Sequence, residues 1–76
     1  MGEIPQVSGA RVVRALNRTG WQLARVQGSH HVLKHPKRPG LRVVIPVHSQ
    51  PLRRGTLADI LKKAGLSLDE FKELLS

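Results

Sequence analysis

The three short β-prone segments in the middle of the chain constrain its fold more than any other feature. They span residues 21–27, 30–35 and 41–47, and they are separated by Gly-Ser and by a segment with the sequence KRPG. Alternating and β-branched residues predict strands, and glycine and proline predict the turns between them. We therefore expect a three-stranded antiparallel meander, with Pro46 at a sheet edge or at the end of the third strand.

Helices are predicted on both sides of these strands. Ser8 is a suitable N-cap for a first helix over residues 9–18, which has an apolar stripe and a second face with arginines. Gly20 should end this helix. After the strands, Thr56 is expected to cap a second amphipathic helix that ends at Gly65.

A third, short helix should begin after Ser67, which forms a capping box with Glu70. The order of elements is then helix, three strands, helix and short helix, an α+β fold of the α-β-β-β-α(-α) type. Two amphipathic helices suffice to cover one face of the sheet and leave the other face open. This is the layout of double-stranded-RNA-binding domains, and the open face would carry the function.

The length of 76 residues predicts a single domain over residues 1–76, with residues 1–7 as a loose terminus. A chain this short has no room for a deep cofactor pocket, so we expect no cofactor and a functional surface or shallow cleft. Cysteine is absent, which excludes disulfides and thiolate zinc sites. The sequence shows neither a signal-peptide h-region nor a membrane span, so a soluble cytoplasmic protein is the default expectation.

The basic residues are unevenly distributed. The net charge is +8 and the pI is near 11.6, yet no carboxylate occurs between Ile4 and Ala58, where Lys and Arg recur. Charge of one sign is typical of a protein that binds a polyanion, although some basic small domains are merely soluble. No helix combines a basic face with a broad aromatic and apolar one, which favours nucleic acid over a membrane as the partner.

Three of the four histidines lie between positions 30 and 35. A metal site is disfavoured because His30 and His31 would point to opposite faces of a strand, while His31 and His35 would lie ~13 Å apart. A catalytic imidazole is the second alternative. RNA carries its own nucleophile, the 2′-hydroxyl, so one base and nearby cations would form a minimal ribonuclease without a metal. A plain polar surface is the third alternative.

The alternation of side chains along the second strand decides which histidine lies on the open face of the sheet. Leu33 is its larger apolar residue and should face the helices. The residues on its side would be His31 and His35, and those on the open, basic side would be His30, Val32 and Lys34. If Val32 is the buried residue instead, every assignment reverses.

Several segments, taken together, resemble the HicA family, the toxin half of the HicAB toxin–antitoxin systems. These segments are GW at 20–21, RVQGSHH at 25–31, the KHP that follows, VVIPVH at 43–48 and PLRRGTLADILKKAGLSLDEF at 51–71. The similarity runs from about Val12 to Phe71, which is nearly the whole chain. The combination and spacing of these segments are specific to the family, whereas no single segment is specific on its own.

The resemblance implies a double-stranded-RNA-binding-like fold and an mRNA interferase, an endoribonuclease that cleaves transcripts. It implies an essential histidine at His30, or alternatively at His31, with Gly28 and Ser29 shaping the turn before it. It also implies a HicB-like antitoxin that covers this histidine and usually also binds operator DNA. His48 and Thr56 match flanking positions of the family for which the resemblance gives no role. The expected capping role of Thr56 already explains its presence.

Two functions of different class follow. The first is a metal-independent endoribonuclease that acts on mRNA, with His30 as general acid or base and Lys34, Arg25 and Arg42 as phosphate contacts. The alternative is a non-catalytic RNA-binding module of the same fold. A helix-turn-helix DNA binder is disfavoured, because the last helix carries the acidic residues Asp69, Glu70 and Glu73.

Overall fold

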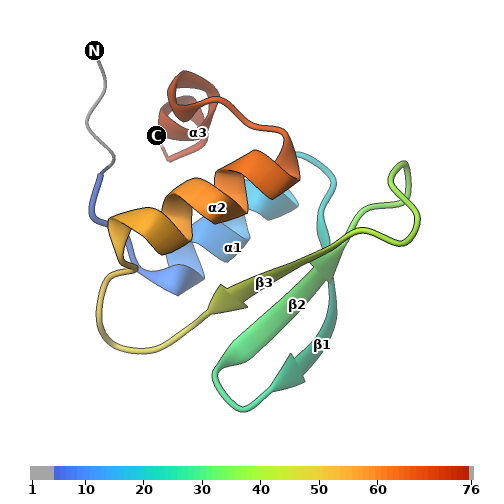
Figure 1. The fold of residues 1–76 in the computed structure, drawn as a ribbon, viewed down its shortest axis with the longest axis horizontal. Helices are drawn as coiled ribbons and strands as arrows, with labels where there is room; N and C mark the ends of the chain where they lie inside the picture. Colours follow the sequence, from blue (N-terminus) through green and yellow to red (C-terminus); the bar gives the residue numbers. More distant parts are fainter. Residues whose placement is uncertain (1–4, 76) are drawn as a thin grey trace.

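The computed structural model describes residues 5–75. The elements along the chain are α1 (Gly9–Asn17), β1 (Gln22–Gln27), β2 (His30–Lys34), β3 (Arg42–Pro46), α2 (Arg54–Ala64) and α3 (Leu68–Leu74). The predicted α+β class and the α-β-β-β-α(-α) order are confirmed, and the helices lie together on one side of the sheet (Figure 1). Within residues 5–75, none of the helices combines the length and apolarity that a membrane crossing requires.

The sheet is an antiparallel meander with the strand order β1-β2-β3. His30 lies opposite Pro46 on β3, and Leu33 lies opposite Val43. The register of β1 shifts between Leu23 and Arg25, which marks a bulge. Since β3 is an edge strand and ends at Pro46, both expectations for this proline are met.

The core forms between the helices and two of the three strands. Leu33, Val43 and Ile45 of β2 and β3 are fully buried. The helical side chains packed around them include Val12, Leu16, Leu57, Ile60 and Phe71. Helices α1 and α2 both contact β3, whereas every residue of β1 is exposed. Strand β1 therefore projects beyond the cover that the helices provide.

The beginning of α2 differs from the sequence expectation. Thr56 is not its N-cap: the helix begins at Arg54, and Arg53 is the N-cap without a side-chain hydrogen bond. Leu52 is buried, and its N–H donates to the carbonyl oxygen of Val7 at 2.9 Å. Because this contact fixes the backbone just before Arg53, the helix begins three residues earlier than a cap at Thr56 would place it.

Three further local expectations have mixed outcomes. Ser8 caps α1 as predicted, but α1 ends at Asn17 with Arg18 as its C-cap, so Gly20 (φ 97°) shapes the following turn instead. Gly65 ends α2 in the left-handed conformation, as expected. The loose terminus was expected over residues 1–7, of which 1–4 lie outside the described residues. At Val7 that expectation is wrong, because Val7 is buried and bonded to Leu52.

The predicted capping box of α3 is present. The backbone N–H of Ser67 donates to Glu70 Oε1 at 2.8 Å, and the N–H of Glu70 donates to Ser67 Oγ at 3.1 Å. The hydrogen bond from the Ser67 backbone, helped by the Ser67 side chain, holds the pKa of Glu70 below its ordinary value. The box holds the start of the helix that supplies Phe71 to the core.

The lowered pKa of Glu70 predicts a pH-dependent contribution to stability. A depressed folded-state pKa stabilises the protein above the ordinary glutamate pKa, and this contribution is lost as the pH falls through the folded-state value. The free energy of unfolding of Glu70→Ala should therefore differ most from that of the unsubstituted protein near neutral pH, and the difference should shrink in acid. Urea denaturation of both proteins at a series of pH values measures this difference in the free energy of unfolding. A difference independent of pH would contradict the role assigned to the carboxylate.

Candidate active site

The strand register places one histidine and three cations on the face of the sheet that points away from the helices. Residues that lie directly opposite one another share a face. The side chains that share this face are His30, Val32 and Lys34 of β2, Gln22, Arg25 and Gln27 of β1, and Arg42, Val44 and Pro46 of β3. We call this set the open face. It carries no carboxylate, since the chain has none between Ile4 and Ala58.

The cations of the open face lie at different distances from His30. Arg25 is opposite Val32, two residues along β2 from His30, which corresponds to ~7 Å. Lys34 and Arg42 are opposite each other at the far end of the strands, ~13 Å from His30. Arg25 is therefore placed to share a ligand group with His30, and the other two are placed to contact a more distant part of the same ligand.

His30 follows directly after a tightly held turn. Gly28 has a φ of 58°, which favours glycine, and nothing lies within 4 Å of the position a Cβ would take. The carbonyl oxygen of Ser29 accepts a hydrogen bond from Val47 N–H at 2.6 Å, which ties the turn to the segment after β3. His30 itself is exposed. The turn thus presents an accessible imidazole at one end of the open face.

His31 points to the other side of the sheet. It lies opposite Ile45, which is fully buried, and opposite Val26 of β1. Its Nδ1 atom is shielded from solvent and has no hydrogen-bond partner within the part of the chain that the structure describes. His30 and His31 therefore serve different faces, and Leu33, not Val32, is the buried residue of β2.

His35 has a structural environment. Its Nδ1 accepts a hydrogen bond from Lys37 N–H at 3.1 Å, so the neutral ring carries its proton on Nε2, which donates to the carbonyl oxygen of Thr19 at 3.0 Å. The ring also meets Trp21 edge to face at 5.3 Å. A Cβ on Gly20 would lie 2.7 Å from His35 Nε2. His35 thus joins the end of β2 to the turn between α1 and β1.

The two histidines should therefore differ in their effect on stability. His35→Ala removes both hydrogen bonds and the contact with Trp21, and we expect it to lower the free energy of unfolding by about 2–3 kcal/mol. His30→Ala is the matched control, because His30 is exposed, and it should change stability by less than about 0.5 kcal/mol. Denaturant unfolding of both variants measures the difference. Equal effects of the two substitutions would contradict the structural role of His35.

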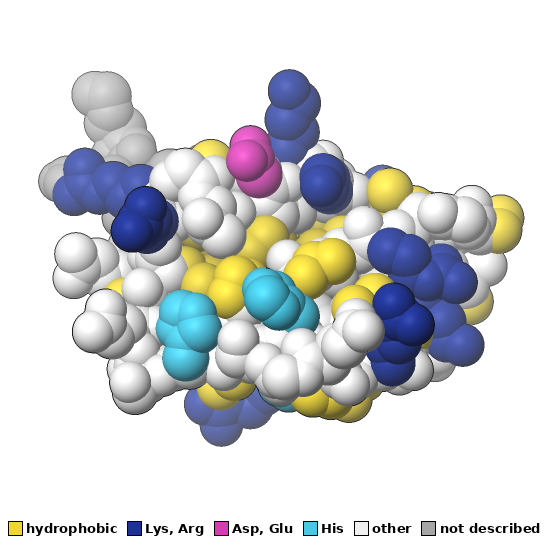
Figure 2. Space-filling view, turned by 60° about the horizontal axis from the view of Figure 1, so that its bottom comes forward, with side chains coloured by type: hydrophobic (Ala, Val, Ile, Leu, Met, Phe, Trp, Pro, Cys, Tyr) yellow, Lys and Arg dark blue, Asp and Glu magenta, His cyan; other side chains and the backbone are white. Residues whose placement is uncertain are grey.

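The fourth histidine, His48, lies in the loop after β3. It is exposed and lines a pocket of ≈ 420 Å³ together with Pro46, Arg53 and Thr56. Figure 2 shows histidine side chains close together on one face of the molecule, beside hydrophobic side chains and flanked by Lys and Arg. Nothing in the sequence indicates that His48 lies two residues beyond the residue opposite His30, because that placement depends on the strand register.

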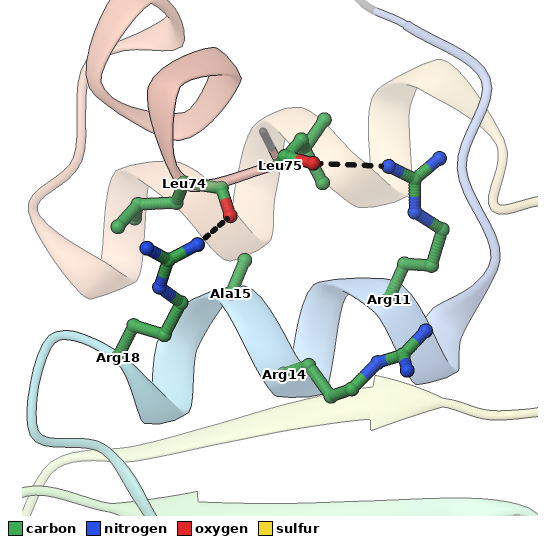
Figure 3. A pocket seen from close by; sticks show the side chains of 6 residues that line it. All are labelled: Arg11, Arg14, Ala15, Arg18, Leu74 and Leu75. Carbon is green, nitrogen blue, oxygen red and sulfur yellow. Dashed lines mark hydrogen bonds between the residues drawn. The ribbon is translucent and has the colours of Figure 1, made fainter.

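The arginines of α1 belong to a different surface. Arg11 Nη2 donates to the carbonyl oxygen of Leu75 at 3.3 Å, and Arg18 Nη1 donates to that of Leu74 at 3.0 Å. Figure 3 shows both side chains reaching from α1 to the end of α3. Cations at the C-terminal end of a helix satisfy its free carbonyls and complement its dipole. Part of the basic charge therefore holds α3 against α1 and is not on the open face.

Between residues 5 and 75 there is no group of three or more His, Cys, Asp or Glu side chains that could hold a metal ion. The arrangement instead offers imidazoles and cations on an accessible surface. Such a set can bind an anionic chain and move a proton near neutral pH.

Comparison with models of protein families finds a match to the chain. The model of the family described as the HicA toxin of bacterial toxin-antitoxin matches residues 9–66. The chain belongs to the HicA toxin family. None of the curated proteins compared with this HicA chain matches it. As a HicA toxin it is one half of a toxin–antitoxin pair and has an antitoxin as its partner. The matched residues run from the start of α1 to just beyond α2, and they include the turn at Gly28, His30 and His48.

Proposed function

We propose that this HicA toxin is an endoribonuclease that cleaves mRNA, with His30 as the general base. The observation that supports this most is the position of His30, which is exposed at one end of an open face that bears three cations and no carboxylate. RNA is the polyanion that carries a nucleophile beside each phosphate. A protein surface that binds the RNA backbone and removes the proton of one 2′-hydroxyl is therefore sufficient for cleavage.

The proposed reaction is an internal transesterification. His30 removes the proton of a ribose 2′-hydroxyl, and the 2′-oxygen attacks the adjacent phosphorus. The bond from phosphorus to O2′ forms as the bond to O5′ breaks, which yields a 2′,3′-cyclic phosphate and a 5′-hydroxyl once O5′ has taken up a proton. Arg25 is near enough to stabilise the negative charge on the phosphoryl oxygens, and Lys34 and Arg42 would bind phosphates farther along the strand.

His31 is the other histidine of the motif, and its surroundings favour His30 for this role. The His31 ring lies on the helix-facing side of β2 with Nδ1 shielded, away from Arg25 and Lys34. Gly28 and Ser29 contribute by shaping the turn and leaving its outer side open to the RNA backbone. We infer that the antitoxin is a HicB-like protein with an acidic surface that covers His30, since the +8 charge of the toxin would steer such a partner.

The nuclease proposal predicts the effect of one substitution. His30→Ala should reduce cleavage of a labelled mRNA by about 10²–10⁴-fold, the usual contribution of a general base. His31→Leu is the control, because it places an apolar side chain of similar size against Ile45, and it should retain cleavage. Cleavage by the unsubstituted protein and by His31→Leu should proceed in EDTA, because every proposed group belongs to the chain itself. Undiminished cleavage by His30→Ala, or loss of cleavage in EDTA, would contradict the proposal.

The alternative, a non-catalytic RNA-binding module, would bind labelled mRNA and leave it whole. A gel of the labelled mRNA therefore separates the two functions, since intact RNA after incubation with the unsubstituted protein favours the binding module.

The open face also predicts which cations bind RNA. In a His30→Ala background, which should prevent cleavage, Arg25→Ala should weaken RNA binding and reduce the slope of log K against log salt by about one. Arg11→Ala is the matched control, because Arg11 is bonded to Leu75 on another surface, and its slope should stay unchanged. Filter binding at several salt concentrations measures both. An unchanged slope for Arg25→Ala would show that RNA does not use this part of the open face.

A further inference from the structure

We propose that His48 is a second catalytic group of this reaction and supplies the proton that the departing O5′ requires. The inference rests on the proposed nuclease function and assigns a role to a residue that lies outside the Gly-Ser-His-His motif.

The backbone brings His48 to the same end of the sheet as His30. Pro46 is directly opposite His30 in the register of β2 and β3, and His48 follows Pro46 by two residues. The hydrogen bond of 2.6 Å from Val47 N–H to the Ser29 carbonyl oxygen holds the intervening residue against the turn that precedes His30. Two histidines that are 18 positions apart in sequence are thereby attached to one corner of the sheet.

The pocket beside His48 suits a phosphate and its neighbouring sugar. Its volume is ≈ 420 Å³, and its lining includes Pro46, His48, Gln50, Arg53 and Thr56. Pro46 connects this pocket to His30, because it also lies on the open face. Arg53 supplies a positive charge, and the first turn of α2 contains no acidic residue that would repel an anion. The pocket therefore continues the RNA-binding surface past His30.

The imidazole of His48 is available for chemistry. It is exposed and makes no hydrogen bond within the part of the chain described here, in contrast to His35, both of whose nitrogens are engaged. A base and an acid on either side of the phosphorus let the proton leave O2′ while another arrives at O5′. His30 gains one proton and His48 loses one, so the step conserves protons and charge, and the two histidines exchange protonation states.

A substrate with a better leaving group tests this assignment. A short RNA with sulfur in place of the bridging O5′ needs no proton on its leaving group, whereas normal RNA does. His48→Ala should slow cleavage of normal RNA by about 10²–10³-fold but slow cleavage of the sulfur-bridged RNA by less than about tenfold. His30→Ala should slow both substrates to a similar extent. His48→Gln, which keeps a polar side chain of similar size, should behave like His48→Ala.

The pH dependence provides a second readout that a structural role would not alter. A general acid must be protonated, so the rate of the unsubstituted protein on normal RNA should fall on the alkaline side of a bell-shaped profile. His48→Ala should lose this alkaline fall and keep the acidic limb. The loss of RNA affinity on adding His48→Ala to His30→Ala, measured at one salt concentration, should be smaller than the loss of rate of about 10²–10³-fold.

The outcomes separate this inference from the proposed function. If the unsubstituted protein cleaves and His48→Ala is unimpaired, or if it is impaired equally on both substrates, His48 is not the acid and the nuclease function stands. If the unsubstituted protein cleaves neither substrate, the nuclease function fails and this inference fails with it.

Discussion

The burial of Leu33 against the helices is the contact on which the rest of this HicA structure depends. Residues of a strand alternate between faces, so fixing Leu33 inside with Val43 and Ile45 also fixes its neighbours. His31 is drawn to the helix side, and His30 is turned outward with Lys34. A single apolar side chain thus decides which of two adjacent histidines meets solvent and which is shielded.

The sequence carried enough information for the order of elements, whereas the outward position of His30 was one of two alternatives that the burial of Leu33 decides. The capping box at Ser67 and the glycine at Gly65 are local signals, and the structure follows them. Thr56 shows the opposite case: it is a suitable cap, but the burial of Leu52 sets the start of α2 before Thr56 is reached. Local preference fails here because a contact between distant segments outweighs it.

Charge pattern alone could not assign the basic residues to surfaces. Arg11 and Arg18 form part of the same basic stretch as Arg25, yet their guanidinium groups bind carbonyls at the end of α3. These bonds join residues 64 and 56 positions apart, and such pairings leave no periodic trace in the sequence. The position of His48 at the end of the sheet that carries His30 is also set by contacts between distant segments. It depends on the register of β2 and β3 and on the hydrogen bond between Val47 and Ser29.

Strand β1 has a further consequence for the free protein. Among residues 5–75 no strand pairs with its outer side, and Leu23 and Val26 are about half exposed, 48% and 51%, which are conditions that favour edge-to-edge association between copies. The bulge between Leu23 and Arg25 breaks the even spacing of the backbone groups on that side, and the charge of Arg25 repels its counterpart on an approaching copy. The irregularity in β1 thus discourages fibril-like stacking of a toxin that has lost its antitoxin.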